Sequence, residues 1–103
     1  MKLNEIVIAR GALQKLIEQD LPLRQAFALV KLTDRINVHL DFYGRERWKI
    51  GDDEEKIREL EAFEVDDLPE TRLQISMEGN LRLSAQDVKA LEPFIEFIDD
   101  AYT

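Results

Sequence analysis

The chain has 103 residues, a length typical of one domain, and a net charge of −8 at neutral pH. It contains no cysteine, which excludes disulfides, a thiol nucleophile and zinc–thiolate sites. Because contacts with phosphates need basic surface, the negative charge argues against direct binding of nucleic acid. No apolar run resembles a signal peptide or a membrane span, so we expect a cytoplasmic protein with no membrane contact.

The negative charge is concentrated in one block. Residues 1–51 carry nine Lys or Arg against six Asp or Glu, whereas residues 52–70 carry two against ten. Residues 71–103 carry three against six. The sequence therefore combines a mildly basic first half with a strongly acidic middle segment.

Residues 5–18 are expected to form a first helix. Ile6, Ala9, Leu13 and Leu16 recur at helical spacing, and Asn4 is a suitable N-cap. The β-branched residues within 5–9 also fit a short strand, and the sequence leaves that alternative open. The short connection that follows predicts an antiparallel packing of this helix on the next one.

Residues 22–50 read as one long amphipathic helix. Pro22 suits the first helical position, and Gly51 suits a stop with positive φ. The expected apolar face consists of residues three and four apart: Leu23, Ala26, Phe27, Val30, Thr33, Ile36, Asn37, Leu40 and Tyr43. Leu29, Leu32 and Val38 widen that face. We expect the Pro22 end to be buried under the first helix and the end of the chain.

Residues 52–63 are predicted to form a third helix that folds back along the long one. Asp52 and Asp53 are N-cap candidates, and Ile57 and Leu60 give a narrow apolar face. At about 1.5 Å per residue, the first and third helices together nearly match the roughly 43 Å of the long helix. These lengths allow a homodimer but do not require one.

The remaining residues predict a small β-hairpin and a final helix. Residues 71–77 alternate between apolar and polar, Gly79 and Asn80 fit a hairpin turn, and residues 81–83 fit a return strand. Ser84 and Asp87 resemble a capping box before a short helix, and residues 93–102 are expected to form an apolar helix that docks on the core. The expected fold is α+β, mainly helical, in a single domain of residues 1–103: a long central helix with antiparallel helices on it, a small β-hairpin and a C-terminal docking helix.

The sequence offers no pattern of residues typical of an active site. His39 is the only histidine, and the acidic residues 52–55 do not follow the spacing of a calcium loop. N-capping and compensation of the helix dipole account for that acidic cluster. We therefore expect a protein that is not an enzyme, with no catalytic residues, no metal site and no cofactor.

Three stretches resemble a family of small uncharacterised proteins encoded by phages and prophages of Gram-positive bacteria. They are LNEIVIARGALQKLIEQDLPLRQAFALVKL at the start, EVDDLP after the acidic segment, and LRLSAQDVKALEPFIEF near the end. The stretch between Trp48 and Lys56 is shorter than in typical members. The resemblance implies a phage context, with a location in the host cytoplasm or on the virion. It carries no catalytic residue with it.

Two functions are considered for the chain, both of them through a protein partner. The first is a non-catalytic interaction or assembly factor, with Arg45, Arg47 and Trp48 as candidate contact residues. We expect Trp48 to pack on the third helix, whereas an exposed Trp48 would be a candidate hot spot. The second is an acidic mimic of nucleic acid that inhibits a host nucleic-acid-binding or defence protein. Its candidate contact residues are Glu59, Glu61, Asp66 and Asp67.

Overall fold

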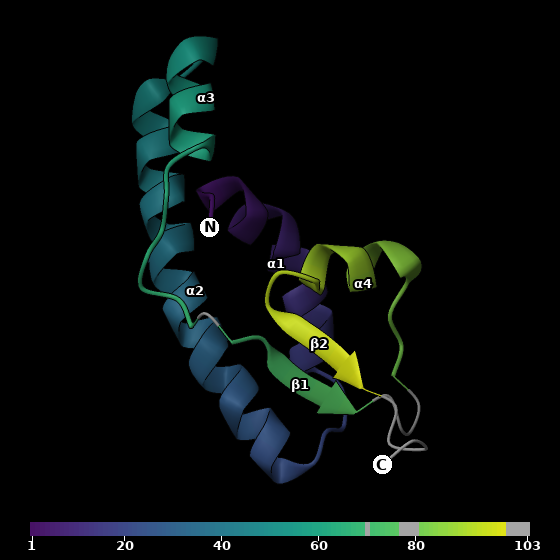
Figure 1. Ribbon diagram of the computed structural model, residues 1–103. Helices are drawn as coiled ribbons and strands as arrows, with labels where there is room; N and C mark the ends of the chain where they lie inside the picture. The colour runs from purple at the N-terminus through teal and green to yellow at the C-terminus, as the bar shows by residue number, and fades with distance from the viewer. Residues whose placement is uncertain (70, 77–80, 99–103) are drawn as a thin grey trace.

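The computed structural model describes residues 1–69, 71–76 and 81–98 of the chain. The elements follow in the order α1 (Leu3–Ile17), α2 (Leu23–Ile50), α3 (Glu54–Glu61), β1 (Leu73–Ser76), α4 (Ala85–Leu91) and β2 (Ile95–Ile98). Figure 1 shows α2 along one side of the molecule, with α1, the two strands and α4 gathered on the other side. The expected α+β, mainly helical class is confirmed.

The long helix α2 determines the elongated shape of the molecule, whose extents are 49 × 24 × 21 Å. Pro22 is its N-cap rather than its first helical residue. The helix ends at Gly51, whose φ of 66° is open to glycine at little steric cost. Asp53 then caps α3 by accepting a hydrogen bond from the Lys56 N–H at 3.3 Å. As predicted, α3 folds back along the C-terminal end of α2 (Figure 1).

Residues 5–9 are helical, so the strand alternative for this stretch does not apply. Helix α1 begins at Leu3, two residues before the predicted start, and Asn4 lies inside it rather than capping it. The reason is a pairing of the chain start with the connection after α3. The Leu3 N–H donates to the Phe63 carbonyl at 2.8 Å, and the Val65 N–H donates to the Met1 carbonyl at 2.8 Å.

The predicted hairpin and final helix are wrong. β1 pairs with β2 in parallel, with Leu73 opposite Ile95 and Ser76 opposite Ile98. Parallel strands need a crossover, which the segment containing α4 supplies. Leu81–Leu83 forms no strand, and the predicted turn at residues 79–80 lies outside the described residues. The Ile and Phe side chains of β2 explain the misreading, because β-branched and aromatic residues favour strands.

The start of α4 is as predicted. The Ser84 hydroxyl accepts from the Asp87 N–H at 3.1 Å, and the Asp87 carboxylate accepts from the Ser84 N–H at 3.0 Å. These two bonds form the reciprocal capping box. Lys15 of α1 adds an ion pair to the same carboxylate at 3.0 Å. The pair links α4 to α1.

The core is centred on α1 rather than on the long helix. Six α1 residues are buried, whereas α2 contributes three. The core residues are Leu3, Ile6, Ala9, Ala12, Leu13, Leu16, Leu29, Leu32, Ile36, Leu60, Val65, Ile75, Leu91, Phe94 and Ile95. Within the described parts of the chain, no helix combines the length and apolarity needed to cross a membrane.

Candidate interaction surface

The most exposed apolar side chains of the long helix lie on one narrow face. They are Leu23, Phe27, Val30, Val38 and Trp48, which expose 87%, 62%, 44%, 64% and 88% of their surface. At about 100° per residue, they fall within a sector of roughly 80°. We call this set the α2 row. The row therefore lies on a single face of the helix.

The buried side chains of α2 lie on the opposite face of the helix. Leu29, Leu32 and Ile36 point toward α1 and the core, about 180° from the α2 row. The sequence prediction placed Leu23, Phe27 and Val30 on the core face, which is wrong. The predicted burial of the Pro22 end is also wrong, since Leu23 is exposed. As predicted, α1 runs back alongside α2 in the opposite direction, and the first turns of α2 lie beyond the end of α1 (Figure 1).

The N-terminal part of the α2 row has a recognisable spacing. Leu23, Phe27 and Val30 occupy positions i, i+4 and i+7 of the helix, and all three are exposed. This spacing is the one used by amphipathic helices that insert into apolar grooves of partner proteins. The Lys31 ammonium lies 4.9 Å from the centre of the Phe27 ring. We call Leu23, Phe27 and Val30 the α2 triad.

The predicted contact residues at the other end of α2 differ in their surroundings. Trp48 is 88% exposed and does not pack on α3, so that prediction is wrong. Arg45 is also exposed. Arg47 is half-buried, and its Nη1 donates to the Gly51 carbonyl at 2.6 Å, so it closes the end of the helix. Trp48 therefore remains a candidate contact residue, whereas the Arg47 side chain stabilises the C-terminal end of α2.

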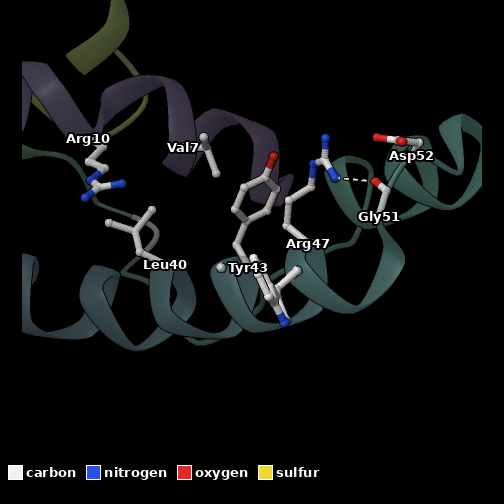
Figure 2. Close-up of a pocket in the computed structure, with 9 residues that line it drawn as sticks. Val7, Arg10, Leu40, Tyr43, Arg47, Gly51 and Asp52 are labelled. Carbon is white, nitrogen blue, oxygen red and sulfur yellow. Dashed lines mark hydrogen bonds between the residues drawn. The ribbon is translucent and has the colours of Figure 1, made fainter.

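A cleft of about 500 Å³ lies between α1 and the C-terminal half of α2. Figure 2 shows Tyr43 pointing from α2 toward α1, with Arg10 to one side and Arg47 to the other. Asp52 is the one carboxylate among the described residues that line it. Two guanidinium groups, a phenol and one carboxylate form no pair of nucleophile and base. This cleft carries no catalytic arrangement among those residues.

The predicted acidic contact residues do not form one cluster. Glu59 and Asp66 are exposed, and Glu61 is half-buried on α3. Asp67 lies next to His39, with 2.7 Å between the carboxylate Oδ1 and the imidazole Nε2. Across the described residues, no group of three or more His, Asp or Glu side chains could hold a metal ion. One carboxylate of the acidic segment, that of Asp67, therefore has a partner within the molecule, although it stays exposed.

Sequence reasoning missed a second group of residues, the cations beside β1. Arg24, Lys31 and Arg35 follow one edge of α2, and Arg72 faces them across a groove. Arg72 is remote from the others in the sequence, so their proximity needed the fold. For the α2 row a signal did exist, because the apolar residues of α2 cover too much of the helix for one core face.

No protein-family model matches the chain, and neither the curated proteins nor the solved structures include a match.

Proposed function

We propose that the protein is a non-catalytic protein–protein interaction factor that presents the α2 triad to an apolar groove on its partner. In the phage context that the sequence resemblance implies, the role is that of an assembly accessory factor. The observation that carries the proposal is the exposure of Leu23, Phe27 and Val30 at helical groove-binding spacing.

The energetic argument rests on the free energy of burying these side chains. Fully burying one large apolar side chain contributes about 1.5–3 kcal/mol. Three such side chains on one helix face can therefore supply much of a micromolar affinity, which corresponds to about 8 kcal/mol. Leaving them in water gains the isolated protein nothing, so their exposure is best explained by a partner.

The rigidity of α2 supports the same role. The helix is fixed to the core by Leu29, Leu32 and Ile36 on the opposite face. The triad is therefore held in its binding conformation before the partner arrives. A preordered surface lowers the entropic cost of association.

The proposal is tested by site-specific photo-crosslinking in phage-infected cells. A photoreactive amino acid is placed at Val30, and crosslinked products are compared between the parent and a Leu23→Asp/Phe27→Asp variant. We expect a discrete adduct that the double variant loses. Ile8→Asp is the matched control, because Ile8 is 60% exposed on α1, away from the triad. An adduct of equal yield in the double variant, or the absence of any adduct, would contradict the proposal.

The second candidate is the acidic inhibitor of a host nucleic-acid-binding or defence protein. It is favoured by the exposure of Glu59 and Asp66 beside the acidic start of α3. Glu59→Lys/Asp66→Lys should then abolish binding of the host protein and leave folding intact, with affinity that falls steeply as salt rises. Binding of the host protein that persists after the charge reversal and at high salt would contradict this second function.

A further inference from the structure

A groove of about 770 Å³ separates the N-terminal half of α2 from β1 and the segment before it. This size is within the range of small-ligand and peptide sites. Its apolar lining consists of Ala28, Leu32, Leu68, Pro69, Leu73, Phe94 and Ile98. Figure 1 shows β1 between α2 and β2. Leu73 and Gln74 of β1 line the groove together with Ile98 of β2.

The rim of this groove is cationic. Arg24, Lys31 and Arg35 line it from α2, and Arg72 lines it from the other side. Among the described residues, none of the four takes part in an ion pair, and no lining residue is acidic. Arg72 reaches only the Glu92 carbonyl, at 3.4 Å. Four cations without an ion pair among the described residues surround one apolar groove, in a chain of net charge −8, and they favour an anionic ligand.

The groove also offers hydrogen-bonding groups suited to a peptide. Leu73 donates its N–H to the Phe94 carbonyl at 2.8 Å, so it uses its main chain toward β2. In a parallel ladder the bonding direction alternates, so Gln74 directs its N–H and carbonyl to the other side, where the groove lies. A strand added there would extend the sheet by β-augmentation.

A second polar group supports the same conclusion. The Gln25 Oε1 is buried without a hydrogen-bond partner, and Gln25 lines the same groove. An unpaired buried acceptor costs about 1–3 kcal/mol. A ligand that carries N–H groups would give this oxygen a donor after a rotation of the side chain. The carboxylate of an ionised fatty acid offers no such donor.

We propose that this groove binds an extended peptide segment of a partner protein, with apolar side chains on one face and carboxylates on the other. The peptide pairs with the main chain of Gln74, with its apolar face on Leu32 and Leu73. Its carboxylates then meet the rim. Lys31 and Arg35 are about 6 Å apart along the helix, close to the roughly 6.6 Å between alternate side chains of a strand.

This site shares no residue with the α2 triad, although Lys31 at its rim contacts Phe27, so it goes beyond the proposed function and does not rest on it. The test is fluorescence polarisation with a labelled peptide that alternates Glu with Val. We expect saturable binding below about 1 mM that weakens with salt. Replacing Glu by Lys, or Val by Ser, should weaken binding at least tenfold. Two peptides with N-methyl groups on alternate nitrogens test the pairing. The peptide methylated on the N–H groups that face β1 should bind more weakly, and the peptide methylated on the N–H groups that face away should bind as before.

Charge reversal in the protein locates the site. Arg24→Glu/Arg35→Glu should weaken the affinity for the peptide at least tenfold. Arg72→Glu, on the opposite rim of the groove, should also weaken it. Arg10→Glu/Arg45→Glu is the matched control, with the same change of charge on exposed residues outside the groove. It should leave the affinity within twofold, as should Leu23→Ala/Phe27→Ala, which removes the apolar side chains of the triad without placing a carboxylate beside Lys31.

Three results would overturn the proposal. One is the absence of peptide binding up to about 1 mM. Another is an equal loss in the control and groove variants. The third is a preference for anionic phospholipid vesicles or single-stranded RNA over the Glu–Val peptide, which would assign the groove to another class of ligand.

Discussion

The two faces of α2 are both apolar, yet only one of them is covered. Leu29, Leu32 and Ile36 are buried, whereas Phe27 and Val38 expose more than half of their surface. The same helix, with the same 3.6-residue period, thus carries a core face and a free face. Apolar periodicity identifies the helix but does not tell which face is the core.

The difference between the faces lies in what interrupts them. Asp34, Asp41 and Arg45 fall within the sector of the α2 row and divide it into a triad and two single side chains. The opposite face, which carries Leu29, Leu32 and Ile36, meets no charged residue before Arg47 near the end of the helix. A buried face tolerates no unpaired charge, because desolvation of a charge is costly. A surface that binds a partner can carry charges at its rim.

The largest expected effect compares one residue from each face. Ile36→Ala removes a side chain that is 1% exposed and should cost about 2–5 kcal/mol of unfolding free energy. Val38→Ala, two residues along the helix and 64% exposed, should stay within about 0.5 kcal/mol. Urea denaturation of both variants measures the difference. Similar losses for the two would mean that the α2 row is covered in solution.

A smaller effect is expected from the glycines of α2. Gly51 has a φ of 66°, so Gly51→Ala should cost about 1–3 kcal/mol through backbone strain. Gly44 is the matched control, because it lies inside the helix and a Cβ there meets nothing within 4 Å. Gly44→Ala should stabilise the protein by about 0.5–1 kcal/mol. If both substitutions stabilise the protein, then the positive φ at Gly51 is not fixed in solution. The Trp48 end of the α2 row would then not be rigid.

A smaller change still is expected at the start of α4, which packs on α1. The Ser84 N–H bond, with Lys15 nearby, lowers the pKa of Asp87 below its ordinary value of 3.8. A lowered pKa means that Asp87 stabilises the fold fully above pH 3.8, and this stabilisation is lost as pH falls through the lower folded-state pKa. Asp87→Ala should therefore be less stable than the parent at neutral pH, with a gap that closes in acid. Urea midpoints between pH 7 and acid measure this gap, and a constant gap would contradict the prediction.

The sequence was sufficient for features that depend on neighbouring residues. The bounds of α2 and α3, the caps at Asp53 and Ser84 and the stop at Gly51 all follow from local patterns. It was insufficient where pairing joins distant segments. Residues Ile95–Ile98 could be assigned as a strand only from their pairing with Leu73–Ser76. A short apolar run by itself fits a helix or a strand equally well. The contact surface was predicted at Trp48 but missed at Leu23 and Phe27, since the sequence does not tell which face of α2 packs against α1.

The smallest expected effect concerns Trp48, the only tryptophan of the chain. Because Trp48 is 88% exposed, its fluorescence should be that of a solvated indole, and unfolding in urea should shift its emission very little. Collisional quenching by acrylamide should likewise be nearly as efficient as in the unfolded chain. Phe42→Trp in a Trp48→Phe background is the control, because Phe42 is half-buried against Phe63 with 5.7 Å between ring centres. The emission of that control should shift clearly on unfolding.

A dilution series tests whether a second copy of the chain covers Trp48. Emission that moves toward longer wavelength as the protein is diluted would mean that it does. Emission independent of concentration leaves the α2 row free for a different partner.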